Sequence, residues 1–319
     1  MLLIHGFGAN SHHWRHTLPA LEQGAQVVAL DLLGFGASDK PPSCLEGESP
    51  RPGAVRYGFA LWAAQVVDLI SEQLSATPPP AATSSAVTAS AAAAPVRRLH
   101  LVGNSIGGMV ALSAACRLRR QPIAGCRLEQ VVLIDCAQRR LDDKRLAEAP
   151  PLSRLGRPGL KRLVRQRWLV GSLFRLLARP AVIRQVLQQA YPSGANIDDE
   201  LVDLLYRPST DAGAMESFRG FVNLFNDALA PELLAELSSN NGDGNGDRDA
   251  AVPVRLIWGE ADPWEDPAEA RQWAARYPCI RNLELLPGVG HCPHDEAPEL
   301  VNPILQRWIL PPADAGTEV

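Results

Sequence analysis

The stretch LHLVGNSIGGMVAL, residues 99–112, limits the possible folds of this chain more than any other part of the sequence. An apolar run with the length of a buried strand leads into the small residues Gly-Asn-Ser-Ile-Gly-Gly, and apolar residues at helical spacing follow. A strand that turns directly into a helix is the building unit of a parallel sheet covered by helices. The stretch therefore predicts an α/β fold with Ser105 in the turn.

The alternation of strands and helices extends along most of the chain. Further apolar runs of strand length occur at 2–6, 27–31, 131–135, 253–259 and 282–288, and helical patterns occur at 57–74, 107–119 and 266–276. Because most of these runs are continuously apolar, we expect strands that are covered on both faces. The predicted fold is a mostly parallel sheet with helices on both sides.

Three segments depart from this alternation. Residues 137–230 are rich in Arg and Leu, have helical patterns, and are predicted to form a helical cap inserted into a core made of 1–136 and 231–319. The segments 76–95 and 238–250 contain too few apolar residues to pack, and we expect them to be flexible loops.

The composition argues against several classes of protein. The 319 residues are 46% hydrophobic and 21% charged, which is ordinary for a soluble protein with a sizeable core. The net charge of −4 gives no case for nucleic-acid binding, and no apolar stretch reaches the roughly 18–20 residues that span a bilayer. Six cysteines without a Cys-x-x-Cys pair, and no secretory signal, favour free thiols in a reducing, cytoplasmic compartment.

The turn after residues 99–103 has the pattern of a nucleophile elbow. Residues 103–107 read Gly-Asn-Ser-Ile-Gly and match G-x-S-x-G, with the glycines Gly103 and Gly107 on either side of Ser105. Between a strand and a helix, such glycines let the two elements approach closely while the serine hydroxyl is lifted above the edge of the sheet. The alternative interpretation is a serine that only caps the helix.

A serine hydroxyl needs a neighbouring base to become a nucleophile. His291 follows the last predicted strand, and its imidazole can accept and return a proton near neutral pH. Asp262 follows the preceding strand and is predicted to orient that imidazole. Asp135, at the end of 131–135, is the alternative acid, because the end of that strand faces the same site.

The remaining requirement is a pair of donors for the oxyanion that forms during acyl transfer. We expect the backbone amides of Phe7 and Ile106 to supply it, with His5 and Gly6 shaping the loop HGFGAN after the first strand. The histidines of GHCPH have no further ligand cluster to support them. The sequence therefore predicts neither a metal nor a cofactor.

Several segments together resemble a known family. LLIHGFGANSHHW, VVALDLLGFGASDKP, GNSIGG, WGEADPW and GHCPHDEAPELVN are similar to the α/β-hydrolase fold, and more narrowly to the chlorophyll dephytylase and pheophytinase group of plants and cyanobacteria. Residues 198–223 also look like that group. The resemblance implies that Ser105, Asp262 and His291 form a catalytic triad. It further implies hydrolysis of the ester between a tetrapyrrole propionate and a long isoprenoid alcohol, at or near an internal, thylakoid membrane.

The chain departs from the pattern of this family in two places. The loop at 76–95 is longer than in relatives, and family members have two further strands before the strand that starts this chain. Without them, VVALD would be an edge strand, which is prone to aggregation. We therefore expect that the N-terminal strands are missing because the sequence is truncated, for example by a misassigned start codon.

The predicted cap carries a strong excess of positive charge. From Arg139 to Arg184 there are 13 Lys/Arg and 3 Asp/Glu residues. Residues 160–190 are predicted to line an apolar groove for a hydrophobic ester, with Trp168 and Phe174 among the lining side chains. The arginines would then face outward and could contact an anionic membrane surface. An ordinary solvated helical face is the alternative interpretation.

Other functions fit the same fold. Haloalkane dehalogenases and epoxide hydrolases use an aspartate nucleophile, so Ser105 argues against both. Hydrolases of C–C bonds, peptidases and perhydrolases keep the serine and stay open. A non-catalytic binding module would usually lack a member of the triad, and none is missing here.

Overall fold

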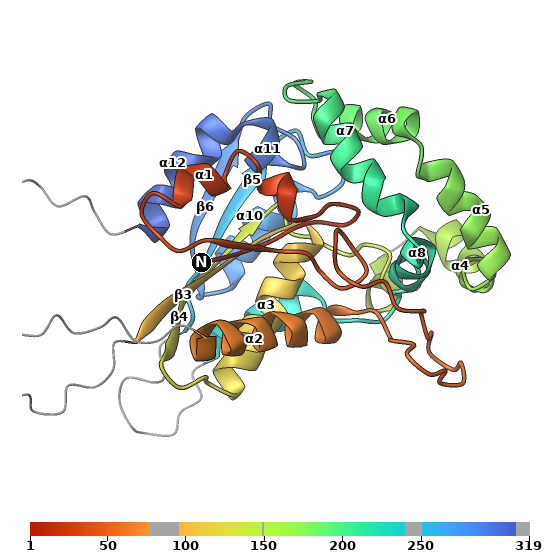
Figure 1. Ribbon diagram of the computed structural model, residues 1–319, viewed down its shortest axis with the longest axis horizontal. Coiled ribbons are helices and arrows are strands. Elements are labelled where there is room, and N and C mark those ends of the chain that lie inside the picture. The colour runs from red at the N-terminus through yellow and green to blue at the C-terminus, as the bar shows by residue number, and fades with distance from the viewer. Residues whose placement is uncertain (77–95, 149, 240–250, 311–319) are drawn as a thin grey trace, which may run out of the picture.

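The computed structural model describes residues 1–76, 96–148, 150–239 and 251–310 (Figure 1). Its strands form one six-stranded sheet with the order β2-β1-β3-β4-β5-β6, and every neighbouring pair is parallel. The strands are β1 (Leu2–Ile4), β2 (Val28–Leu30), β3 (Arg97–Asn104), β4 (Cys126–Ile134), β5 (Val254–Gly259) and β6 (Ile280–Leu286). The predicted parallel sheet is confirmed, with β2 at one edge.

Helices cover both faces of this sheet, and each face has its own hydrophobic cluster. One cluster includes α2 (Phe59–Ala76), α3 (Ile106–Arg120), α9 (Ala230–Ser238) and α10 (Pro267–Arg276). The other includes η1 (Ser11–Trp14), α1 (Leu18–Leu21) and α12 (Pro298–Ile309), which follows the short α11 (Pro293–Glu296). The continuously apolar strands are buried on both sides because side chains alternate between these two clusters.

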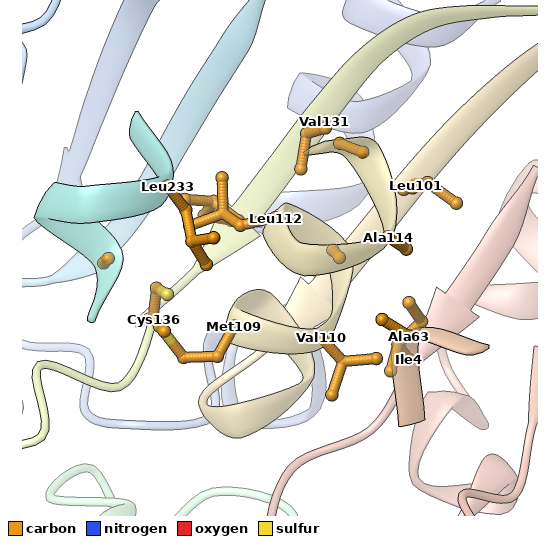
Figure 2. Packing of buried hydrophobic residues seen from close by; sticks show 14 of the residues in the cluster. Ile4, Ala63, Leu101, Met109, Val110, Leu112, Ala114, Val131, Cys136 and Leu233 are labelled. Carbon is orange, nitrogen blue, oxygen red and sulfur yellow. The ribbon is translucent and has the colours of Figure 1, made fainter. Parts of the chain in front are cut away.

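The helix after Ser105 lies at the centre of the larger cluster. Figure 2 shows Met109, Val110, Leu112 and Ala114 of α3 among side chains from β1, β3, β4, α2 and α9. Each of these four side chains is fully buried. The turn that carries Ser105 is therefore fixed on one side by a strand of the sheet and on the other by a packed helix.

Between β4 and β5 the chain forms further helices, which Figure 1 shows on the side of the sheet where the strands end. They are η2 (Asp143–Glu148), α4 (Pro151–Val164), α5 (Arg167–Leu177), α6 (Pro180–Ala190), α7 (Asp199–Tyr206), η3 (Arg207–Thr210) and α8 (Ala214–Val222). We call α4 to α8 the cap helices. Apart from residues 76, 238 and 239, the two predicted flexible loops lie outside the described residues.

Two further findings concern the cysteines and the apolar character of the helices. Each of the six cysteines, all within the described ranges, is a free thiol. Among the helices of the described ranges, none combines the length and the apolar character needed to pass through a bilayer.

Candidate active site

Ser105 occupies a strained turn between β3 and α3. Its φ of 54° and ψ of −121° lie where residues other than glycine are rarely found. The backbone is held there by three hydrogen bonds: its N–H donates to Ile134 (2.9 Å), and its carbonyl accepts from Gly108 (3.0 Å) and Ala137 (3.1 Å). The side chain makes no capping hydrogen bond to α3, so helix capping does not explain the serine.

The two glycines of the motif are required by close backbone contacts. A Cβ atom on Gly103 would lie 2.2 Å from the carbonyl oxygen of Gly107. A Cβ atom on Gly107 would in turn lie 2.2 Å from the carbonyl oxygen of Ile4, in β1. Any side chain at either position would force the helix away from the sheet and would move Ser105 with it.

His291 and Asp262 form a buried hydrogen-bonded pair. Nδ1 of His291, in the loop after β6, lies 2.8 Å from Oδ2 of Asp262, in the loop after β5. Oδ1 of Asp262 accepts from the amides of Trp264 (2.8 Å) and Glu265 (3.1 Å). Burial alone would raise the pKa of Asp262, but the hydrogen bond and charge of His291, with the amide donors, lower it below its ordinary value. The carboxylate therefore stays charged, accepts a hydrogen bond from Nδ1 of His291, and so keeps the proton of the neutral imidazole on Nδ1.

The backbone of His291 is hydrogen-bonded to the turn that carries Ser105. Its carbonyl oxygen accepts a hydrogen bond from Nδ2 of Asn104 (3.1 Å), the residue before Ser105. Its ring meets the ring of Trp264 edge-on, with centroids 4.8 Å apart. Within the described residues the His291 ring hydrogen-bonds Asp262 alone, so its Nε2 makes no hydrogen bond with the hydroxyl of Ser105. In hydrolases without substrate such a bond is often absent, and it forms when substrate binds.

Asp135 lies behind this pair rather than on the imidazole. Its Oδ1 accepts from the amide of Gly259 (3.0 Å), and Oδ2 has no hydrogen-bond partner within the described residues. Burial and the adjacent carboxylate of Asp262 raise the pKa of Asp135 well above its ordinary value. Burial therefore disfavours the charged form of this carboxyl group, in contrast to Asp262.

Among the described residues, the same three side chains form the group of acidic and histidine ligands that could hold a metal ion. One ligand atom each from Asp135, Asp262 and His291 lies within 4.8 Å of the others. The contact between His291 and Asp262 has the length of a hydrogen bond, and burial disfavours the charged form of Asp135, so the group is better suited to proton transfer than to holding an ion. The imidazole of His294 is elsewhere, between the rings of His13 (4.7 Å) and Trp14 (4.2 Å).

The loop after β1 passes directly beside Ser105. A Cβ atom on Gly6 would lie 3.2 Å from Cβ of Ser105, and Phe7 is the next residue. The amide of Ile106 belongs to the first residue of α3, where a helix offers no acceptor of its own. Both amides expected at the oxyanion hole therefore belong to segments that border the serine.

His5 fixes that loop through its two ring nitrogens. Nδ1 lies 2.7 Å from the carbonyl oxygen of Gly6, and Nε2 accepts from the amide of Leu32 (3.1 Å). Burial lowers the pKa of His5 to about 4, so the ring is neutral and Nδ1 carries the proton. His5 is thus a positioning residue for the loop.

An aromatic group borders the same loop, and two of its members, Phe218 and Phe221, were not identified from the sequence. Phe7 stacks on Phe221 with ring centroids 3.8 Å apart, and it approaches Phe218 at 6.1 Å. Phe174 lies 5.3 Å from Phe218, whereas Trp168 is 71% exposed. Of the two proposed groove residues, only Phe174 therefore joins this group. The three-residue spacing of Phe218 and Phe221 on α8 was the available signal, since it places both rings on one side of a helix.

Two hollows are found away from these residues. One of about 550 Å³ lies between α6 and α7, beside Arg184 and Asp199. Another of about 420 Å³ lies among α2, α3 and α9, beside Ser113 and Arg117. Neither is lined by Ser105 or His291.

Comparison with known proteins gives relatives of one fold and several activities. Pheophytinase of Arabidopsis thaliana chloroplasts is 26% identical over 354 residues, which cover 100% of this chain and 62% of that protein. Epoxide hydrolase 3 of Xenopus tropicalis is 23% identical, over 97% of this chain and 71% of that one. The structure of a serine hydrolase involved in carbazole degradation matches with a TM-score of 0.63 and 17% identity, over 96% of this chain and 88% of that one.

The matched relatives differ in length and in the reactions that their names give, so they support the fold and do not identify a substrate. The family model described as the alpha/beta hydrolase family matches residues 1–304, nearly the whole chain. The six-stranded parallel sheet and the turn at Ser105 are the features that such a fold requires. This chain belongs to the alpha/beta hydrolase family.

Proposed function

We propose that this protein is a serine hydrolase that cleaves carboxylic esters through a covalent acyl-enzyme. The observation that carries the proposal is the 2.8 Å contact between His291 and Asp262, beside a serine in a strained strand-to-helix turn. A negative Asp262 stabilises the imidazolium that forms when His291 takes a proton. This combination is what activates a serine hydroxyl at neutral pH.

The reaction would proceed in two halves. Oγ of Ser105 attacks the ester carbonyl as Nε2 of His291 takes its proton, and the amides of Phe7 and Ile106 stabilise the oxyanion. The C–O bond then breaks, the alcohol leaves with the proton from His291, and the acyl group stays on Ser105. A water molecule, deprotonated by His291, attacks the acyl-enzyme, releases the acid and restores the serine.

The substrate we propose is an ester with a long apolar alcohol, such as the phytyl ester of chlorophyll or pheophytin. The similarity to pheophytinase along all of this chain supports it. So does the aromatic group of Phe7, Phe174, Phe218 and Phe221, which offers apolar contact beside the serine loop. Each methylene that is buried against such rings contributes about 0.8 kcal/mol, so a long chain would bind firmly.

Epoxide hydrolysis is less well supported, although one relative carries that name. Epoxide hydrolases use an aspartate as nucleophile, and this chain has Ser105 at the turn. C–C bond hydrolases, peptidases and perhydrolases share the serine and would be distinguished by their substrates.

The test is turnover of three substrate classes by the purified protein: chlorophyll a, pheophytin a and short p-nitrophenyl esters. We expect release of phytol, and Ser105→Ala should lower all turnover by about 10⁴–10⁶. Ser113→Ala, a matched change in α3 outside the proposed triad, should keep it. Cleavage of short esters alone would refute the phytyl ester as substrate, and unchanged turnover by Ser105→Ala would refute the serine mechanism.

A further inference from the structure

We propose that the outward side of α4 and the start of α5 dock this protein onto an anionic lipid bilayer. We call this surface the docking face and define it by Leu152, Leu155, Arg162, Leu163, Trp168 and Arg175. It goes beyond ester hydrolysis, because binding to a bilayer requires no chemistry at Ser105.

The helix α4 turns its apolar side toward solvent, whereas an ordinary surface helix turns that side toward the core. Leu152 and Leu155 are 82% and 81% exposed, and Leu163 is 52% exposed. Their spacing of three and eight residues places them on one side of α4. A surface helix normally turns such an apolar stripe toward the core, so this stripe lacks a partner within the described residues.

The charged side of α4 faces the protein instead. Arg157 is buried, with its guanidinium 4.4 Å from the ring centre of Phe225 and its Nε 3.3 Å from a carboxylate oxygen of Asp143. Lys161 pairs with the same Asp143. These contacts fix the rotation of α4, and they leave its leucines pointing to solvent.

Charge identifies the partner of the exposed stripe. Between Glu148 and Asp198 the sequence has nine Lys/Arg and no Asp/Glu. Arg162, Arg175 and Arg179 are exposed, and no carboxylate of the described residues pairs with them. A second copy of this chain would bring the same positive surface against itself, because symmetric dimers pair identical patches.

An anionic bilayer satisfies both parts of the docking face. Leucines and a tryptophan can enter the boundary between headgroups and acyl chains, while neighbouring arginines contact lipid phosphates. Each basic residue near such a surface strengthens binding about fivefold. Trp168, which is 71% exposed at the start of α5, has the amphipathic side chain that is enriched at this boundary.

The experiment is vesicle flotation of the full chain carrying Ser105→Ala, so that the result does not depend on turnover. Vesicles of phosphatidylcholine alone are compared with vesicles that also contain phosphatidylglycerol. We expect clearly stronger binding to the anionic vesicles, weakened by salt. Arg162→Gln with Arg175→Gln should weaken anionic binding by about 25-fold, from two factors of about five.

Two further variants separate the apolar part from the charge. Leu152→Gln with Leu155→Gln should weaken binding to both kinds of vesicle, with an unchanged circular dichroism spectrum. The matched control, Arg281→Gln with Arg307→Gln, removes two exposed charges from β6 and α12 and should bind as the parent does. Equal binding to both vesicle types, or equal losses in the control, would overturn the proposal. So would a dimer in analytical ultracentrifugation that Leu152→Gln with Leu155→Gln dissociates, because a second copy would then cover the face.

Discussion

The turn at Ser105 and the helix α4 use the same residue types in opposite ways. A Cβ atom on Gly107 would meet backbone at 2.2 Å, whereas one on Gly156 of α4 would meet nothing within 4 Å. Leu101 of β3 is fully buried, whereas Leu155 is 81% exposed. The difference teaches that the proposed chemistry depends on atoms fixed by packing, while α4 leaves apolar side chains exposed to solvent.

In the tightly packed region around Ser105, the largest predicted effect is on kcat/KM, and it distinguishes the carboxyl groups of Asp262 and Asp135. Asp262→Asn should lower kcat/KM by about 10⁴, because an amide cannot stabilise the imidazolium and favours the wrong tautomer of His291. Asp135→Asn should lower kcat/KM less than tenfold, since Asp135 bonds the amide of Gly259 and not the imidazole of His291. Steady-state kinetics on a p-nitrophenyl ester measure both. The reverse order of the two losses would make Asp135 the acid of the triad.

The next largest predicted effect is on the free energy of unfolding, and it differs between a glycine beside Ser105 and a glycine in α4. Gly107→Ala should lower the free energy of unfolding by about 3 kcal/mol, because the new methyl group overlaps the backbone of β1. Gly156→Ala should raise it by about 0.5–1 kcal/mol, because alanine is the better helix former and the site is open. Urea denaturation checks both changes. A stable, active Gly107→Ala protein would show that the elbow is not as tightly packed as described.

Acid should weaken the core selectively, since residues 137–230 contain no histidine. Burial lowers the pKa of His100, in β3, to about 4 from 6.5. Between pH 6.5 and 4 the unfolded chain therefore binds a proton that the folded chain excludes, and stability falls as the pH falls through this window. Replacement by glutamine should remove up to about 3 kcal/mol of that decrease, at 1.36 kcal/mol for each pH unit.

Denaturation at pH 7 and pH 4.5 measures the effect of His100→Gln. Identical curves for the parent and His100→Gln would mean that His100 titrates normally in the folded protein.

The smallest expected effect is in the cap. Leu155→Ala should change the free energy of unfolding by less than about 0.5 kcal/mol, because the side chain is mostly in solvent. Leu101→Ala, its counterpart in β3, should cost about 2–5 kcal/mol. A large loss from Leu155→Ala would show that α4 packs on a surface of this chain, and the docking face would then not be available to a bilayer.

The sequence predicted the core better than the cap for a physical reason. A continuously apolar strand must be covered on both faces, so β3, β4 and β5 and the turn after β3 could be located from residue types alone. The cap helices are amphipathic, and that pattern does not say which way a helix is turned. Trp168 of α5 was expected in a groove, yet its side chain is 71% exposed. In α4, Arg157 and Lys161 pair with Asp143 and turn the charged side of that helix inward.

The contacts among residues distant in the sequence were also beyond prediction. Asp135 was considered as a competitor for the imidazole, whereas its carboxyl group lies behind Asp262 and bonds Gly259. Phe218 and Phe221 meet Phe7 only because α8 lies against the loop after β1. Patterns along the chain give the ends of elements, but such pairings depend on how the loops between those elements are folded.

Labelling with a fluorophosphonate, followed by peptide mass mapping, tests the central claim most directly. This probe reacts with serines whose hydroxyl has been activated by a neighbouring base. We predict one adduct on folded protein, at Ser105, with His291→Ala labelled at least about a hundredfold more slowly because general-base assistance is lost. A folded protein that takes no label at Ser105, or takes it equally fast without His291, would contradict the account.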